Sequence, residues 1–286
     1  MKKLLLIDAN SLIHRSFHAL PPLTTPQGES INAIYGLSGI LLKILKEHQP
    51  DYAAAAFDRP EPTFRDSMYK EYKAQRPPTA NELVSQLIRA REVFKQFGIL
   101  TVEKAGFEAD DIVGTLAEHA KNHPDLQVVI FSGDKDNLQL VNGQVVVEFL
   151  KVGVSKTITY DKSLFLQEYG FLPERLVDYK ALIGDASDNI PGVKGIGPKT
   201  AMDLLKEYGT LEKIYEDIEL IPKKAVQEKL KEHQADAFLS KQLATIKRDV
   251  PLELTFGDLK YIPFEKEKIK EFFGSLGFKS LVERLG

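Results

Sequence analysis

The sequence predicts an α/β fold with a central, mostly parallel sheet, followed by a helical region toward the C-terminus. Short apolar runs alternate with longer amphipathic segments in the first part of the chain, which is typical of parallel strands joined by helical crossovers. Beyond about residue 165 the strand signal fades and helical spacing dominates. We therefore expect a sheet-based part over residues 1–168 and a helical part over residues 169–286.

Five apolar runs in the first part predict strands, because they are short and bounded by turn residues. The segments between them have apolar residues at helical spacing. The predicted strands lie near 3–8, 52–58, 99–103, 127–132 and 144–150, and the predicted helices near 31–48, 80–98 and 108–123. In the second part, helices are expected near 164–170, 174–185, 198–209, 210–218 and 222–246.

The composition excludes several classes of site. The 286 residues include no cysteine, so disulfides, zinc–thiolate sites and thiol nucleophiles are all excluded. The apolar run at the N-terminus stops at Asp8, which is too short for a signal-peptide core. No other apolar stretch approaches the length of a membrane span. We therefore expect a cytoplasmic protein with no membrane partner.

Nine carboxylates in five short clusters are the strongest functional signal. Four of the clusters follow apolar runs, and in an open parallel sheet ligands bind beyond the carboxyl ends of the strands. Carboxylates that converge there cannot all stay ionised unaided, and hard divalent cations prefer oxygen ligands. The sequence therefore predicts a Mg²⁺ or Mn²⁺ site with two or more ions. The nine acids are Asp8, Asp58, Glu108, Asp110, Asp111, Asp134, Asp136, Asp185 and Asp188.

Within the third cluster, Glu108 and Asp111 are three residues apart and are expected on one face of a helix, with Asp110 pointing elsewhere unless it sits in the first turn. The formal net charge of −3 comes from 38 basic and 41 acidic residues. Without the nine clustered acids, 32 acids remain against 38 bases, so the rest of the protein carries about +6. A basic surface around an acidic site suits a phosphodiester substrate.

Residues 59–81 combine five basic residues with two tyrosines and several prolines, directly after the strand that ends near Asp58. Interleaved bases and aromatics are typical of single-strand binding, although a solvated charged helix has the same charge pattern. The position beside the predicted metal site favours binding. The candidate binding residues are Arg65, Tyr69, Lys70 and Tyr72, and the candidate catalytic residues are Lys73 and Arg76.

The glycine-rich segment 192–200, GVKGIGPKT, precedes a predicted helix that starts at Pro198. Its spacing fits neither a P-loop nor a dinucleotide-binding fingerprint. Its glycines and the free N–H groups of the next helix predict a helix-hairpin-helix that holds a phosphate backbone. An ordinary glycine-rich helix connection is the alternative. The candidate contacts are Gly192, Lys194, Gly195, Gly197, Lys199 and Thr200.

These motifs together resemble the flap endonuclease (5′-nuclease) family, and most closely the 5′→3′ exonuclease domains of bacterial DNA polymerase I. The shared motifs, in order, are LLLIDANS, AAFD, TFRDSMYKEYKAQRP, FEADDIVGTLA, FSGDKDNLQL and GDASDNIPGVKGIGPKTA. The resemblance implies a PIN-like or resolvase-like fold and a monomeric enzyme of DNA replication and repair. Such an enzyme is a structure-specific 5′ nuclease acting as a 5′→3′ exonuclease and a 5′-flap endonuclease.

The resemblance also implies roles for particular residues. The nine acids would hold two metal ions, with Asp136, Asp185 and Asp188 holding the second ion or orienting waters. Residues about 65–91 would form a helical arch that threads a 5′ single strand. The hairpin at 192–200 would hold a K⁺ through backbone oxygens. Lys73 and Arg76 would neutralise the scissile phosphate.

The implied partners are branched or nicked duplex DNA with a 5′ flap, a fused DNA polymerase domain and the nucleoid. Residues 59–62, RPEP, depart from the family pattern, in which small residues and glycine precede TFR, so the opening of the arch is in question. A small PIN-type ribonuclease has the same sheet and acid plan. A non-catalytic DNA-junction binder could use the same surface, although it would not need all the acids.

Overall fold

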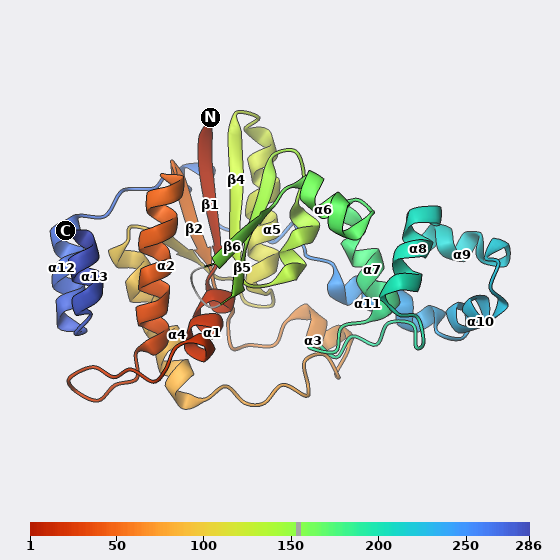
Figure 1. Cartoon of the computed structure of the whole chain (residues 1–286), viewed down its shortest axis with the longest axis horizontal. Helices are drawn as coiled ribbons and strands as arrows, with labels where there is room; N and C mark the ends of the chain where they lie inside the picture. The colour runs from red at the N-terminus through yellow and green to blue at the C-terminus, as the bar shows by residue number, and fades with distance from the viewer. Residues whose placement is uncertain (153–155) are drawn as a thin grey trace.

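A six-stranded sheet lies at the centre of the computed structural model, which describes residues 1–152 and 156–286 (Figure 1). Its strand order is β3-β2-β1-β4-β5-β6. The first five strands pair in parallel, and β6 pairs antiparallel with β5. The predicted mostly parallel sheet is confirmed, with one further strand at its edge. The strands are β1 (Lys2–Asp8), β2 (Tyr52–Ala56), β3 (Leu100–Val102), β4 (Leu126–Ser132), β5 (Val145–Val152) and β6 (Lys156–Tyr160).

Both faces of the sheet are covered, which explains why the first strand is a continuous apolar run. Alternate residues of a strand point to opposite faces, so Leu4 and Leu6 join one core cluster while Leu5 and Ile7 join the other. The first cluster continues into the helix after β3 and the helices that follow β6. The second is formed with the helices over residues 9–19, 32–48 and 81–96 and with the last two helices of the chain.

The helices of the first part are α1 (Ala9–Ala19), α2 (Asn32–His48), α3 (Phe64–Met68), α4 (Asn81–Gln96), α5 (Ala109–His119), η1 (Ala120–Asn122) and η2 (Lys135–Leu140). The expected helical arch over residues 65–91 is helical only at its two ends. The five-residue α3 is followed by turns and an extended stretch, and regular helix resumes at Asn81. Two consecutive prolines at 77 and 78 end the possibility of a continuous helix there.

The helical part begins after β6 and packs against the α5 side of the sheet. Its helices α7, α8 and α11 lie in contact, and α8 to α10 form the end of the molecule farthest from α2 (Figure 1). They are α6 (Lys162–Tyr169), η3 (Pro173–Arg175), α7 (Leu176–Ile183), α8 (Pro198–Tyr208), α9 (Leu211–Glu216), η4 (Ile218–Leu220), α10 (Lys224–Glu232), α11 (Gln234–Ala244) and η5 (Phe256–Leu259).

The last two helices do not belong with this helical region, contrary to the expectation for residues 169–286. The chain returns to the other side of the molecule, where α12 (Lys266–Ser275) and α13 (Lys279–Leu285) lie beside α2 (Figure 1). Ile269 and Phe273 are fully buried in the same cluster as the helices on that face. The C-terminus therefore covers the sheet rather than extending the hairpin region. No helix in the described parts of the chain is long and apolar enough to cross a membrane.

The N-terminus of α2 is capped from another helix. Its own N-cap residue, Ile31, offers no side-chain acceptor. Gln86 of α4 supplies one instead: its Oε1 accepts hydrogen bonds from Ala33 N at 2.7 Å and Ile34 N at 3.3 Å. Its Nε2 donates to Asn32 Oδ1 at 3.1 Å, so the amide is satisfied although it is buried. This one side chain therefore satisfies N–H groups that would otherwise be orphaned in the core.

Replacing Gln86 with leucine should destabilise the fold, because two buried N–H groups would lose their acceptor. We expect a loss of about 2–3 kcal/mol in the free energy of unfolding, measured by urea denaturation. Ser85→Ala on the same helix is the matched control, since the Ser85 hydroxyl is exposed and donates only to Glu82 O within its own helix. Equal effects of the two substitutions would contradict the capping role of Gln86.

Candidate active site

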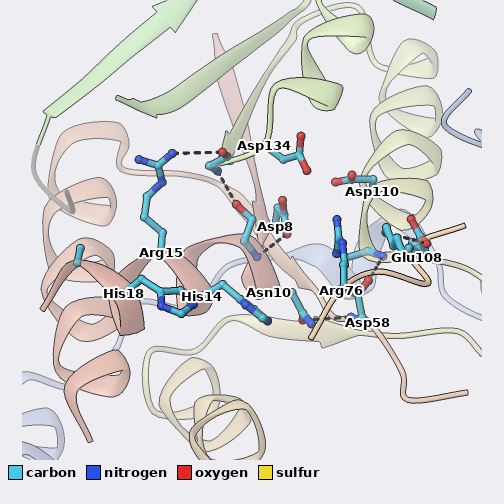
Figure 2. Close-up of a pocket in the computed structure, with 15 residues that line it drawn as sticks. Asp8, Asn10, His14, Arg15, His18, Asp58, Arg76, Glu108, Asp110 and Asp134 are labelled. Carbon is cyan, nitrogen blue, oxygen red and sulfur yellow. Dashed lines mark hydrogen bonds and ion pairs between the residues drawn. The ribbon is translucent and has the colours of Figure 1, made fainter. Parts of the chain in front are cut away.

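The carboxylates converge where the central strands end, as predicted. A cavity of about 550 Å³ opens beyond the carboxyl ends of β1, β2 and β4 (Figure 2). It adjoins a much smaller cavity of about 20 Å³ that shares three of its acids. The acids that line one or both cavities are Asp8, Asp58, Glu108, Asp110, Asp134, Asp136 and Asp188. Asp111 and Asp185 line neither.

The local folding of the chain fixes the direction of these side chains. Asp8 ends β1 and caps α1, since its Oδ1 accepts from Ser11 N at 3.1 Å. Its other oxygen accepts from the Ser132 hydroxyl at 2.7 Å, which joins it to the end of β4. Asp134 follows β4 by two residues and caps η2, accepting from Asp136 N at 2.9 Å. Adjacent strand ends thus hold Asp8 and Asp134 toward one another (Figure 2).

The first turn of α5 supplies the next two acids. Glu108 is the N-cap of this helix, and Asp110 projects from its first turn into the cavity. Asp110 accepts from Asn137 Nδ2 at 2.7 Å. The helix N-terminus also faces Asp58, whose Oδ1 accepts from Ala109 N at 2.7 Å. Carboxylates at a helix N-terminus are favoured by the helix dipole, so this placement offsets part of their repulsion.

Asp111 lines neither cavity, although the sequence predicted it as a metal ligand. Its side chain is fully buried beneath the site, where Arg65 Nη1 and Nη2 bind its two oxygens at 2.7 Å and 2.8 Å. Its oxygens also accept from Lys247 N and Glu108 N. With its oxygens occupied in this way, Asp111 is a structural partner of Arg65 rather than a metal ligand. Asp110 lies on the cavity side in its place.

Burial and mutual repulsion raise the pKa values of Asp8, Asp110 and Asp136. Burial raises the pKa of Asp8 to about 7, with a smaller contribution from the charge of Asp134. Burial and the Asp134 charge likewise raise the pKa of Asp136 to about 7. The pKa of Asp110 is raised well above its ordinary value by burial and by Asp8. Oxygen donors crowded in this way favour a bound cation.

Cations of the protein neutralise the rim of this acid group but not its centre. Lys73 Nζ lies 3.0 Å from Glu108 Oε1, and Arg76 Nη2 lies 2.5 Å from Asp188 Oδ1. In the described residues, Asp8, Asp58, Asp110 and Asp134 make no ion pair with Lys, Arg or His. This all-oxygen donor set fits hard divalent ions such as Mg²⁺ or Mn²⁺.

A second group with metal-ligand chemistry lies outside the cavity, where the last turn of α2 meets β5. It consists of Glu47, His48 and the buried Glu148. His48 Nε2 lies 2.7 Å from Glu148 Oε2. Burial works to raise the pKa of Glu148, but hydrogen bonds from His48 and Thr157 lower it overall. The pair therefore holds α2 against the sheet, which accounts for its burial without a metal.

The basic loop after α3 contacts the acids directly. Lys73 N donates to Asp188 O at 2.9 Å, and Asn189 Nδ2 donates to Glu71 O at 2.7 Å. Lys73 has a positive φ of 54°, which is uncommon for a residue with a side chain and is typical of constrained functional positions. The loop thus places Lys73 and Arg76 on the cavity wall.

Two of the residues predicted to bind DNA are not available for it. Arg65 is 3% exposed because it pairs with Asp111, and it also donates to backbone oxygens of α11 and the residue after it. Tyr72 is 5% exposed, and its hydroxyl donates to Glu108 and Asp188. Both residues therefore hold the loop against the site. Lys70 is exposed and Tyr69 is half-buried, so they remain accessible.

The glycine-rich hairpin connects α7 to α8, and its glycines differ in role. Gly192 is buried, and a Cβ there would lie 2.2 Å from Gly184 N, so it is a packing residue rather than a DNA contact. Gly197 caps α8 and has nothing within 4 Å of a Cβ position. Lys194, Gly195 and Lys199 are exposed and Thr200 is half-buried. The outer half of the hairpin is thus free to meet a phosphate backbone.

One wall of the cavity was not predicted from the sequence. Helix α1 presents polar side chains to the acids, with His14 and His18 one turn apart (Figure 2). Burial and the neighbouring His18 lower the pKa of His14. The residues are Asn10, Ser11, His14, Arg15 and His18. Their i, i+4 spacing after the first strand is a signal that could have revealed them.

The comparisons with known proteins agree with this geometry. The model of the 5′-3′ exonuclease N-terminal resolvase-like domain matches residues 3–170, and that of the 5′-3′ exonuclease C-terminal SAM fold matches residues 171–267. The chain belongs to the 5′-3′ exonuclease family. The resemblance, the fold class and the nuclease class predicted from the sequence are therefore confirmed.

Curated relatives match over almost the whole chain. DNA polymerase I of Caldicellulosiruptor bescii is 44% identical over 286 residues, which cover 99% of this chain and 33% of the relative. DNA polymerase I of Bacillus subtilis is 42% identical over 285 residues, covering 100% of this chain and 32% of the relative. The chain thus spans about a third of the length of these curated relatives.

Solved structures share the fold at low sequence identity. T5 5′-exonuclease with bound zinc has a TM-score of 0.69 and 20% identity, covering 99% of this chain and 97% of its own. The catalytic core of Rad2 with a DNA substrate has a TM-score of 0.61 and 15% identity, covering 100% of this chain and 92% of its own. The family fold therefore extends to structures that hold divalent metal ions and DNA.

The raised pKa of Asp8 predicts a pH-dependent stability. Its ordinary pKa is 3.8 and its folded pKa is about 7, so the folded protein keeps a proton that the unfolded chain loses. This contribution to stability is complete below the ordinary pKa and is lost as the pH rises through about 7. In EDTA, the fall in Tm between about pH 5 and about pH 8 should be smaller for Asp8→Asn than for the wild type.

Asparagine keeps the oxygen that caps α1, which isolates the charge in this comparison. The exposed Asp125, at the opposite end of the sheet, provides the control Asp125→Asn, which should follow the wild type. An Asp8→Asn profile parallel to that of the wild type would contradict the raised pKa. Saturating Mn²⁺ should also reduce the fall in Tm of the wild type, because a bound cation stabilises the ionised acids.

The Arg65–Asp111 pair predicts a stability effect rather than a catalytic one. Arg65→Met leaves a buried carboxylate without its partner, which should cost about 3–5 kcal/mol in the free energy of unfolding. Chemical denaturation measures this loss. Arg59→Met is the control, because Arg59 pairs with Glu61 at the surface and should change stability by about 1 kcal/mol or less. A near-neutral Arg65→Met would refute the structural role.

Proposed function

We propose that this chain is a structure-specific 5′ nuclease that hydrolyses phosphodiester bonds of DNA, as a 5′→3′ exonuclease and a 5′-flap endonuclease. The observation that carries the proposal is that acids with no ion pair among the described residues lie beside two cationic side chains. Lys73 and Arg76 lie on the same cavity wall as the carboxylates of Asp8, Asp110 and Asp134. Metal-assisted phosphodiester hydrolysis requires carboxylates that bind metal ions and cationic side chains that contact the phosphate.

The metal ions, Mg²⁺ or Mn²⁺, would be held by the acids that line the cavities and by Asp185, which lies beside them. Asp8, Asp58, Glu108, Asp110 and Asp134 form one set of donors, and Asp136, Asp185 and Asp188 form the other. When bound, such ions lower the pKa of an attacking water and stabilise the leaving oxygen. The residues of the chain supply the remaining functions, which are to fix the donors, to orient the phosphate and to bind the DNA on either side.

Lys73 and Arg76 would orient and neutralise the scissile phosphate. Each is already paired with a carboxylate, so approach of a phosphate gives the cation a second anionic partner at the same wall. Charge placed where negative charge develops stabilises the transition state more than the ground state. Tyr72 and Arg65 act only through the loop, which they hold in position.

The DNA would span the molecule from the basic loop to the hairpin. Lys70 and Tyr69 would contact the 5′ single strand, while Lys194, Lys199 and Thr200 would contact the duplex backbone. A K⁺ held by backbone oxygens of residues 192–200 would add one cation there. Lys229 Nζ lies 3.0 Å from Gly195 O, so this backbone oxygen already attracts a cation. We further propose that the protein acts as a monomer in the cytoplasm, with DNA of the nucleoid, beside a DNA polymerase.

A cleavage assay tests the function. The substrates are a 5′-labelled flap duplex and a labelled single-stranded RNA, each with Mg²⁺ or with EDTA, and Asp134→Ala serves as the inactive control. We expect release of the flap in Mg²⁺ only, and a rate loss of about 10³-fold or more in Asp134→Ala. Cleavage of the RNA instead would favour a PIN-type ribonuclease. Tight flap binding without cleavage would favour a non-catalytic junction binder.

Lys73→Ala should lower the single-turnover rate at saturating enzyme by about 10²-fold or more, because the ammonium contacts the reacting phosphate. Its binding of the flap duplex should change little. Lys70→Ala removes the same charge from an exposed position in the same loop, so it should weaken binding and leave the single-turnover rate intact. A Lys73→Ala enzyme with normal rate and weak binding would reduce Lys73 to a general electrostatic contact.

Gly197→Val and Lys199→Ala should weaken binding of duplex-bearing flaps and leave the saturated rate nearly normal. The valine fits the free protein, since nothing lies within 4 Å of its Cβ position, but it obstructs an approaching phosphate. Loss of Lys199 should lower the salt slope of binding by about 1. Binding is measured against salt for the flap duplex and its bare single strand. Equal weakening on both would refute duplex recognition by the hairpin.

A further inference from the structure

Lys180 occupies a position that neither the sequence motifs nor the proposed mechanism explains. It projects from α7 between two of the acids and is largely shielded from solvent, with 12% of its side chain exposed. Its Nζ contacts Asp136 Oδ1 on η2, and it lies 2.7 Å from Asp185 Oδ2 in the loop after α7. The ammonium therefore bridges a carboxylate of the sheet region to a carboxylate of the helical region.

In this bridge the positive charge of Lys180 neutralises part of the negative charge of Asp136 and Asp185. A buried ammonium is costly unless it is paired, and here two carboxylates satisfy it. Ser187 fixes the orientation of the Asp185 carboxylate, since Ser187 N and Oγ donate to Asp185 Oδ1 at 2.8 Å and 2.7 Å. The oxygens that Lys180 contacts are therefore held in place. They are the same type of donor that a divalent ion prefers.

An ammonium and a divalent ion cannot both take these oxygens. Asp136 lies beside the small cavity together with Asp110, Asp134 and Asp188, which are members of the candidate donor set. An ion that enters from that side meets Asp136 only after Lys180 releases it. Among the residues that the structure describes, no lysine, arginine or histidine pairs with Asp8, Asp58, Asp110 or Asp134, so the competition is confined to one side of the site.

We propose that Lys180 competes with the second divalent ion for Asp136 and Asp185, and that its withdrawal opens this pair of carboxylates to the ion. The proposal rests on the metal-dependent nuclease function proposed above and adds a residue that regulates binding of the second ion. In this role Lys180 is a positioning residue, since it contacts the metal donors and not the substrate.

The fold connects this residue to the hairpin that would bind duplex DNA. Lys180 lies in the last turn of α7, and its carbonyl accepts from Gly184 N at 2.8 Å. Gly184 in turn packs against the start of the hairpin: a Cβ on Gly192 would lie 2.2 Å from Gly184 N, and a Cβ on Gly184 would lie 2.6 Å from Ile190 O. A shift of the hairpin on binding duplex is thus transmitted to the last turn of α7. Duplex binding therefore favours withdrawal of Lys180 and loading of the second ion.

Mn²⁺ binding to the protein without DNA tests the competition. Lys180→Met keeps the length of the side chain and removes its charge. Titration calorimetry or electron paramagnetic resonance should show one Mn²⁺ bound about tenfold more tightly than in the wild type, or one additional Mn²⁺. Adding Asp136→Asn to Lys180→Met should abolish the gain. Mn²⁺ binding that is unchanged or weaker in Lys180→Met would overturn the proposal.

Lys213→Met is the matched control for the change in net charge. Lys213 also bridges two carboxylates, Asp217 at 2.9 Å and Glu216 at 3.3 Å, but on the exposed surface of α9. Its Mn²⁺ titration should match that of the wild type. An equal gain in both variants would show a general effect of charge and would also overturn the proposal.

Amine reactivity provides a test on the unaltered protein, in case Lys180→Met does not fold. Acetylation of individual lysines is measured by mass spectrometry with EDTA, with saturating Mn²⁺, and with Mn²⁺ and a duplex. Lys180 should become several-fold more reactive with Mn²⁺ and more reactive again with the duplex. Lys241, which is paired with Asp178 and Glu212 away from the cavity, should not change. Unchanged Lys180 reactivity at saturating Mn²⁺ would refute the withdrawal.

These measurements separate the proposal from the nuclease function. A protein that cleaves flaps but shows no change at Lys180 would retain the function and lose the competition. A protein that binds Mn²⁺ more tightly in Lys180→Met but cleaves no flap would retain the competition and lose the nuclease function.

Discussion

Repulsion among buried carboxylates is the constraint on which the rest of this structure depends. The sheet brings Asp8 and Asp134 together at adjacent strand ends, and the first turn of α5 adds Asp110. Burial and proximity raise the pKa values of Asp8 and Asp110, so the folded chain stores unfavourable charge in its centre. A folded protein can hold this arrangement only if its cores, its helix termini and its internal cations offset the cost.

The cations that offset this cost come from segments far away in sequence, and each also fixes one boundary of the site. Arg65 binds Asp111 beneath the acid site and holds α11 by donating to a backbone oxygen of that helix. Arg76 and Lys73 join the basic loop to the acids, while Lys180 joins the helical region to them. The same charges that stabilise the fold therefore position the groups that would meet a phosphate. The stability of the fold and the chemistry of the site therefore depend on the same charged side chains.

The sheet and the converging strand-end acids could be predicted from sequence, because strand periodicity and the carboxyl-end rule need only local information. The roles of Asp110 and Asp111 could not. Their helical spacing leaves open which face is inward, and the partner that decides it, Arg65, lies 46 residues earlier. The sequence showed that Arg65 and Tyr72 lie in a segment of interleaved basic and aromatic residues, but their burial depends on tertiary contacts with Asp111 and Asp188.

The site thus has two kinds of acid. Those at the centre would bind a metal ion directly, and those at the rim would regulate metal binding through their paired cations. Acids at the centre have no internal cation among the described residues and are held by N–H groups and hydroxyls, as Asp8 is by Ser11 and Ser132. Acids at the rim are paired with cations on elements that would also contact DNA. A divalent ion at the centre therefore meets a preformed set of donors, whereas one at the rim must displace a lysine or an arginine. Because those cations lie on the basic loop and on the helix before the hairpin, occupancy of the rim depends on where these two elements sit.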